Sequence, residues 1–114
     1  MLRIYHNPQC KKSRAGLQHL QSKGIPVEII EYIKTPLTEI QLGKLIMKLN
    51  VRPEEIIRKQ EDYFKKNLKG KSFHEHEWIR ILSQNPKLIQ RPIVETEYKA
   101  VIGDPVENID VLFK

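Results

Sequence analysis

Cysteine is almost absent from this chain, since Cys10 is the only one among 114 residues. A single thiol cannot cross-link its own chain, so a small fold held together by disulfides is excluded. Long apolar runs are also missing, because no stretch approaches the roughly 20 residues that a membrane-spanning helix needs. The N-terminal residues lack the basic region and the apolar stretch of a secretory signal. We therefore expect a cytoplasmic protein with no membrane partner.

The remaining composition is that of one globular domain. With 39% hydrophobic and 30% charged residues, the chain is neither disordered nor fibrous. Its length suits a single domain over residues 1–114. The formal net charge of +6 raises the question of a polyanionic partner. However, the densest basic stretch, residues 65–71, has no interleaved aromatic residue and no zinc-finger spacing, so we interpret it as a solvated loop and expect no direct nucleic-acid partner.

The first third of the chain has the pattern of a strand, a helix and a second strand. Residues 2–6 alternate in hydrophobicity and end at a turn signal, Asn-Pro. A helix-length segment, residues 11–23, is followed by Gly24 in the usual capping position. Residues 27–33 are rich in strand formers. A unit of this size is typical of a right-handed βαβ arrangement, so the two strands should be parallel.

The middle of the chain is predicted to be helical. Capping boxes, in which residues three apart satisfy each other's backbone N–H groups, are predicted at Thr38 with Gln41 and at Ser72 with Glu75. Trp78 lies on the apolar side of the second predicted helix and should be buried. The predicted helices cover residues 38–50, 53–57 and 72–84.

The C-terminal part has the pattern of a hairpin and a final helix. Residues 93–96 and 99–102 are strand candidates separated by two residues. Asp104 is predicted to cap a helix over residues 105–113, with a proline in its first turn. The whole order, βαβ followed by helices and then ββα, indicates an α/β fold: a small mixed sheet of about four strands covered by helices, with an inserted helical segment.

Cys10 is the strongest candidate for chemistry. It lies between the first strand and the next helix, where free backbone N–H groups and the positive end of the helix dipole face the sulfur. Three cations, Lys11, Lys12 and Arg14, follow within four residues. Both effects favour the thiolate over the thiol. The alternative, an inert buried cysteine, has no use for such neighbours.

The residue three positions after Cys10 limits its redox chemistry. A thioredoxin-type motif carries a second cysteine there, but this chain has Ser13. A disulfide formed by Cys10 must therefore join another molecule. Ser13 either hydrogen-bonds the thiolate or is an ordinary residue of the first helical turn. No metal site is predicted, because His74 and His76 stand two apart on a helix and diverge.

Three segments resemble one known family. Residues 5–14, YHNPQCKKSR, resemble the N-terminal signature of the glutaredoxin-dependent arsenate reductase (ArsC) family, which also includes the transcription regulator Spx. The segments Ile57-Arg58-Lys59 and residues 89–94, IQRPIV, agree with that family in the same order. The resemblance implies a thioredoxin-like fold, with Pro92 as a cis-proline at the mouth of the site.

The resemblance also implies roles for individual residues. Cys10 would be the nucleophile, and the guanidinium groups of Arg58 and Arg91 would hold an oxyanion and stabilise the thiolate. For Arg58 a surface helix residue is the alternative interpretation, and for His6 a purely structural role. The chain departs from the family at Asp104, near the position where its arsenate reductases carry a third arginine. The residues implied to support the nucleophile are His6, Ser13, Arg14 and Pro92.

Two classes of function follow from the resemblance. The first is a thiol-dependent reductase acting on arsenate or on an oxidised thiol, with no bound cofactor and with glutathione or glutaredoxin as the external donor. The second is a regulator like Spx that contacts the RNA polymerase α subunit. Because Spx proteins typically carry a second cysteine where this chain has Ser13, we favour the enzyme. A family protein without arsenate activity is a third interpretation.

Overall fold

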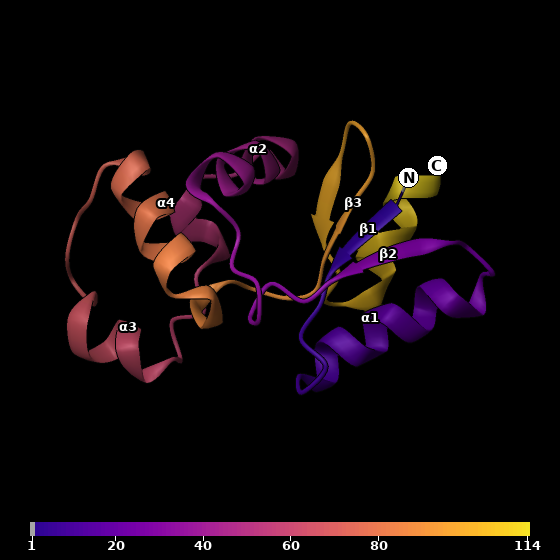
Figure 1. The fold of residues 1–114 in the computed structure, drawn as a ribbon, viewed down its shortest axis with the longest axis horizontal. Helices are drawn as coiled ribbons and strands as arrows, with labels where there is room; N and C mark the ends of the chain where they lie inside the picture. Colours follow the sequence, from indigo (N-terminus) through magenta and orange to yellow (C-terminus); the bar gives the residue numbers. More distant parts are fainter. Residues whose placement is uncertain (1) are drawn as a thin grey trace. The chain divides into compact units, whose positions relative to one another are not determined.

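The computed structural model describes residues 2–114, which form two compact units. The sheet unit comprises residues 2–35 and 91–114, and the helical unit comprises Pro36–Gln90. In sequence, the helical unit is inserted between the second and third strands, as the predicted order of elements requires (Figure 1).

The sheet unit contains a mixed four-stranded sheet in the order β2-β1-β3-β4. Strand β1 (Leu2–Tyr5) pairs in parallel with β2 (Val27–Ile30) and antiparallel with β3 (Ile93–Glu95). Strand β3 in turn pairs antiparallel with β4 (Ala100–Ile102). The predicted parallel pair and the predicted hairpin are therefore confirmed.

Strand β2 is shorter than predicted, because it ends at Ile30 and not at Ile33. The partner strand explains this difference. The N–H of His6 donates to the carbonyl of Ile30 at 2.8 Å, and the chain then turns away at Asn7. Beyond that point, β2 has no neighbouring backbone in β1 to pair with.

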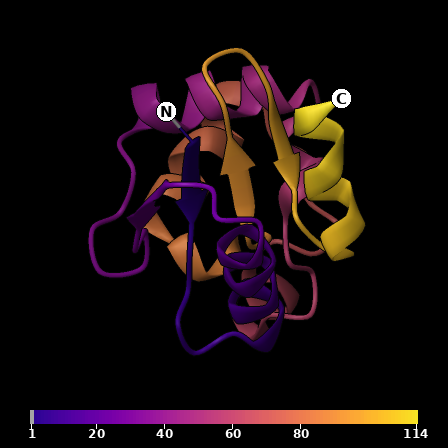
Figure 2. The ribbon, with the colours of Figure 1, turned by 90° about the vertical axis from the view of Figure 1, so that its right-hand side faces the viewer.

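One face of the sheet is covered by α1 (Lys11–Ser22) and the C-terminal 3-10 helix η3 (Val106–Phe113). Figures 1 and 2 show α1 in indigo and η3 in yellow beside the strands. The apolar core of this unit joins both helices to β1 and β3, and its buried members are Leu2, Ile4, Leu20, Val94 and Ile109.

The start of η3 corrects a prediction. Pro105 has an extended backbone and precedes the helix, so Asp104 does not cap it. The Asp104-Pro105 peptide bond is cis. The segment is a 3-10 helix and not the α-helix that the apolar spacing suggested.

The helical unit contains three α-helices and two 3-10 turns. The capping box at the start of α2 is confirmed: the N–H of Gln41 donates to Thr38 Oγ1 at 3.1 Å, and the N–H of Thr38 donates to Gln41 Oε1 at 2.9 Å. Trp78 is buried, as predicted. The elements are α2 (Glu39–Leu49), η1 (Pro53–Ile56), α3 (Asp62–Asn67), α4 (Glu75–Gln84) and η2 (Pro86–Leu88).

Two predictions for this unit are wrong. Helix α4 is not capped by Ser72, because Glu77 accepts a hydrogen bond from the N–H of His74 at 2.9 Å and the helix begins only at Glu75. The basic stretch is not simply a loop either, because its first residues belong to α3. An acidic residue in the first turn of α3 and two lysines in its last turn suit the helix dipole. Among the described residues, no helix is long and apolar enough to span a membrane.

Candidate active site

The loop before α1 holds Cys10 at the start of the helix, as predicted. The N–H of Cys10 donates to the carbonyl of Asn7 at 3.0 Å, which closes a tight turn. Cys10 itself has an extended backbone, and its carbonyl accepts the N–H of Arg14 at 3.0 Å. The guanidinium of Arg14 reaches back to the carbonyl of Pro8 at 3.0 Å. Arg14 therefore fixes the loop that carries the thiol.

Hydrogen-bond donors converge on the Cys10 sulfur. Partial burial would by itself raise the pKa of Cys10, because it disfavours the charged form. The opposing hydrogen bonds outweigh burial and hold the pKa of Cys10 below its usual value. The donors are the backbone N–H of Ser13, the side chain of Arg91 and the backbone N–H of Lys12, and the charge of Arg91 adds to them.

Arg91 reaches this position through the turn that leads into β3. The Arg91-Pro92 peptide bond is cis, as the resemblance implied, and Pro92 is buried. The carbonyl of Pro92 accepts the N–H of Gly103 at 2.8 Å. On the other side, a Cβ atom at Gly16 of α1 would lie only 2.7 Å from Pro92 Cγ. The absence of a side chain at Gly16 thus allows α1 to approach the turn that carries Arg91.

Ser13 and His6 form a buried polar pair beneath the loop. Ser13 Oγ accepts the N–H of Asn7 at 2.9 Å and lies 2.6 Å from His6 Nδ1. Burial lowers the pKa of His6, and the opposing charge of Glu31 does not reverse this effect. Ser13 therefore makes two kinds of contact: its backbone N–H donates to the Cys10 sulfur, and its hydroxyl joins the loop to the residue after β1.

Comparison with known protein sequences identifies the family. Residues 5–112 match the ArsC family. The chain belongs to the ArsC family. It is 34% identical over 113 residues to "Arsenate reductase" of Neisseria meningitidis, with 97% of each chain covered. It is also 39% identical over 110 residues to "Uncharacterized protein YfgD" of Escherichia coli, covering 95% of this chain and 92% of that one.

Solved structures agree with this assignment. The structure described as "Arsenate reductase from Vibrio cholerae" has a TM-score of 0.90 and 31% sequence identity, over 96% of each chain. The mixed sheet and its covering helices are therefore the thioredoxin-like fold of ArsC proteins, as the sequence resemblance implied.

Asp104, which departs from the pattern that the resemblance implies, is paired with a residue in the first turn of α1, next to Cys10. Its Oδ2 atom lies 3.0 Å from Lys12 Nζ. Lys12 is also one of the residues whose backbone N–H bonds the Cys10 sulfur. The carboxylate of Asp104 thus neutralises a cation that belongs to the start of α1.

Arg58, the other arginine implied by the resemblance, belongs to the helical unit. Its N–H donates to the carbonyl of Leu88 at 2.7 Å, next to an isolated bridge between Ile57 and Ile89. Its guanidinium lies 3.4 Å from Glu61 Oε2, and its side chain is 20% exposed. Arg58 therefore lies in a segment with a fixed backbone, and its role as an oxyanion ligand stays a prediction.

Two contributions to the site are not evident from the sequence pattern. The first is a pair of hydrogen bonds made by Asn7: its N–H donates to the Ser13 hydroxyl, and its Oδ1 accepts the N–H of Gln9 at 3.1 Å. The Asn-Pro turn signal gives only the position of the turn. The other is the ion pair of Lys12 with Asp104. No group of three or more metal-ligating side chains occurs among residues 2–114.

Proposed function

We propose that this ArsC-family protein is a thiol-dependent reductase. The thiolate of Cys10 would attack arsenate or an oxidised thiol, and external glutathione or glutaredoxin would restore it. The observation that supports this proposal is the convergence of two backbone N–H groups and the Arg91 side chain on one sulfur. Relatives named as arsenate reductases support the choice of an oxyanion substrate.

The sole cysteine fixes the order of the steps for arsenate. The Cys10 thiolate would displace water from arsenate and form a sulfur–arsenic bond. A thiol from the donor would then attack the Cys10 sulfur, so that arsenic leaves with the electron pair as arsenite and a mixed disulfide remains. A second donor thiol would release Cys10. Overall, arsenic gains two electrons, two donor thiols become one disulfide, and one oxygen leaves as water.

The charges around the site bear on the substrate. Arg91 would contact the oxyanion as well as the thiolate, because a guanidinium offers several donors in a planar fork. Arg58 would be a second ligand. Asp104 opposes tight binding of a multiply charged anion, since its carboxylate cancels the charge of Lys12. We therefore propose that the protein turns over arsenate less readily than a variant with a cation at position 104.

The cell compartment is part of the proposal. Protein thiols are kept reduced in the cytoplasm by glutathione and its partner proteins. A reductase with one free thiol would find its donor there, and its Cys10 would not be lost to permanent oxidation. The RNA polymerase α subunit stays outside this proposal, because Spx proteins typically carry a second cysteine where this chain has Ser13.

A coupled turnover assay tests the function. Arsenate would be supplied with glutathione and glutaredoxin, and the consumption of reducing equivalents would be measured for the parent protein and for Cys10→Ser, Arg91→Ala and Asp104→Arg. We expect no turnover with Cys10→Ser, reduced turnover with Arg91→Ala and increased turnover with Asp104→Arg. Equal turnover by the parent and Cys10→Ser would contradict the proposal. If Asp104→Arg is no faster, only the argument from the missing cation is wrong.

A further inference from the structure

Two adjoining hollows in the helical unit combine lysines with apolar side chains. One has a volume of about 560 Å³ and the other about 220 Å³, and both are lined by Lys59, Phe64 and Gly70. The first adds Lys65 and Lys69. We refer to the two together as the lysine hollow. It involves none of the residues that surround Cys10.

The floor of the lysine hollow is apolar. Ile57, Leu68 and Trp78 line its smaller part, and each is at most 5% exposed. Phe73 packs edge-on against Trp78 with ring centroids 4.8 Å apart, so the indole is held from a second side. Phe64 is half-buried between the two parts. Because the floor itself exposes little surface, an occupant with a large apolar side chain would mainly remove its own apolar surface from water.

The rim of the lysine hollow carries mainly positive charge. Its four lysines are exposed, and none has a carboxylate within ion-pair distance anywhere in residues 2–114. The only acidic residue that lines it is Glu54. The lysines are Lys59, Lys65, Lys69 and Lys71.

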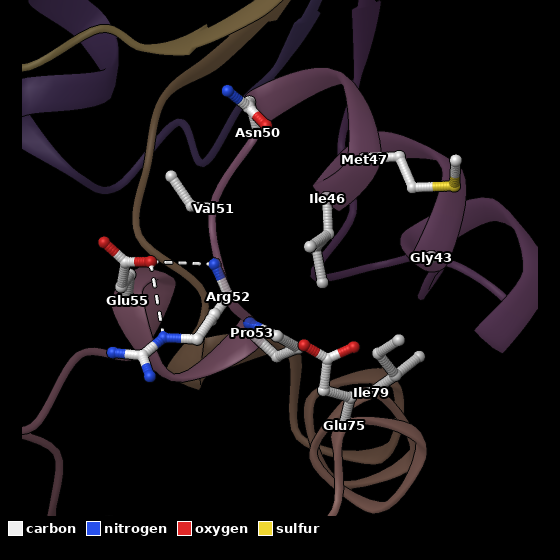
Figure 3. Close-up of a pocket in the computed structure, with 10 residues that line it drawn as sticks. All are labelled: Gly43, Ile46, Met47, Asn50, Val51, Arg52, Pro53, Glu55, Glu75 and Ile79. Atoms are coloured by element: carbon white, nitrogen blue, oxygen red, sulfur yellow. Dashed lines mark hydrogen bonds and ion pairs between the residues drawn. The ribbon is translucent and has the colours of Figure 1, made fainter.

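A neighbouring hollow shows what a rim with its own counter-charges looks like. The hollow in Figure 3 is lined by α2 and by the turn at η1, and it also contains charged side chains. There, however, Arg52 lies 3.9 Å from Glu55 Oε2, which also accepts the N–H of Arg52 at 2.8 Å. Its arginine therefore already has a carboxylate, whereas none of the four lysines of the lysine hollow has one within ion-pair distance among residues 2–114.

The backbone holds the rim in place. At the end of α3, the carbonyl of Phe64 accepts the N–H groups of both Leu68 and Lys69 at 2.9 Å. The N–H of Lys71 then donates to the carbonyl of Leu68 at 3.0 Å, and Gly70 between them has a φ of +79°. A left-handed residue here lets the chain reverse at once. As a result, Lys65 and Lys69 line the larger part of the hollow, and Lys71 lines the smaller part with the apolar floor.

We propose that the lysine hollow binds an acidic peptide segment of a protein partner, with one large apolar side chain on the floor and flanking carboxylates on the lysines. An inorganic anion would gain nothing from the apolar floor. A nucleic acid would bind lysines through its phosphates and stack its bases on exposed aromatic faces, but the indole of Trp78 is only 4% exposed. Flexible ammonium groups around an apolar floor suit glutamates that flank an apolar anchor. This inference is independent of the proposed reductase activity.

The single tryptophan makes the test direct, because Trp78 lines the hollow and is the chain's only indole. A short synthetic peptide with a central Phe flanked by Glu on both sides would be titrated into the full-length protein, and the Trp78 fluorescence would be recorded. We expect a saturable change that weakens with added salt. Lys65→Glu/Lys69→Glu should weaken binding about tenfold, which corresponds to ~1.4 kcal/mol.

Matched controls separate this site from general attraction to a basic protein. Lys44→Glu/Lys66→Glu changes the net charge equally, at exposed lysines that do not line the hollow, and should change the affinity less than about twofold. A peptide with Ala in place of Phe should bind about tenfold more weakly. Equal losses in both double variants, or equal binding of the Ala peptide, would overturn the proposal. Tighter binding of pyrophosphate or of a single-stranded oligonucleotide at the same lysines would also overturn it.

Discussion

Replacing Arg91 with Gln should change the reactivity of Cys10 in opposite directions at low and at high pH. In the structure, the Arg91 side chain donates a hydrogen bond to the Cys10 sulfur and adds a positive charge beside it. Both interactions favour the thiolate. Glutamine removes the charge and keeps an apolar stem and a polar end, so the variant isolates the electrostatic contribution.

The expected magnitude follows from the type of hydrogen bond. Hydrogen bonds to charged groups contribute about 1.5–3 kcal/mol, and we take the lower end because Cys10 is only half-buried. A loss of about 1.5 kcal/mol decreases the thiolate fraction about tenfold at any pH where the thiol form dominates. A more basic thiolate is also a better nucleophile. With a Brønsted coefficient of about 0.4–0.5, each thiolate reacts roughly threefold faster in the variant than in the parent. The net rate should therefore fall about threefold at low pH and rise about threefold where the sulfur is fully ionised.

The assay is the rate of reaction with a neutral disulfide reagent, measured across the pH range for the parent and for Arg91→Gln. Lys11→Gln is the matched control, since it removes one positive charge from an exposed residue next to Cys10 that is not among the donors to the sulfur. We expect the profiles of the parent and Arg91→Gln to cross, and that of Lys11→Gln to follow the parent within about twofold. A profile of Arg91→Gln that coincides with the parent, or that is slower at every pH, would refute the electrostatic reasoning.

Three further results are expected. Gly16→Ala should destabilise the fold by about 1–3 kcal/mol in denaturant unfolding, because the new Cβ would lie 2.7 Å from Pro92. Gly43→Ala has room for its Cβ and should stabilise the fold by about 0.5–1 kcal/mol. Stability changes of the same sign for both variants would be inconsistent with the packing. Asp104→Asn should raise the rate of Cys10 alkylation by the anion iodoacetate, relative to the rate with neutral iodoacetamide, about twofold. This is the effect expected for one unit charge within ~10 Å in water. An unchanged ratio would show that the carboxylate does not act on the site. Because folding lowers the pKa of His6, the unfolded chain binds a proton that the folded chain excludes, so the free energy of unfolding should decrease as the pH falls below about 6.5. His6→Gln should lose less stability over that range than the parent, and an equal loss would assign the effect to other groups.

Local patterns in the sequence predicted the elements that are determined by residues close together in the chain. The alternation of residues 2–6, the capping box at Thr38 and the hairpin before residue 103 each depend on neighbours in sequence, and the structure confirms them. The place of Cys10 at the start of α1 followed from the same type of signal. These features could be predicted because their physical causes lie within a few residues.

Features that depend on distant partners could not be predicted from local patterns. The end of β2 is set by where β1 turns away. Burial raises the pKa of the Tyr5 hydroxyl, and the hydrogen bond that this hydroxyl donates to the buried carboxylate of Glu95 at 2.7 Å, 90 residues away in sequence, raises it further. Asp104 looked like a helix cap, and only the folded arrangement shows that it pairs with Lys12.

The central claim is that the fold lowers the pKa of the Cys10 thiol and so favours its thiolate, and the titration of Cys10 is the most direct test. The ultraviolet absorbance of the thiolate would be followed against pH in the folded parent protein, with Cys10→Ser subtracted as the baseline. The structure predicts a midpoint below that of the same cysteine in the chain unfolded by denaturant. A midpoint at or above that value in the folded protein would contradict the claim.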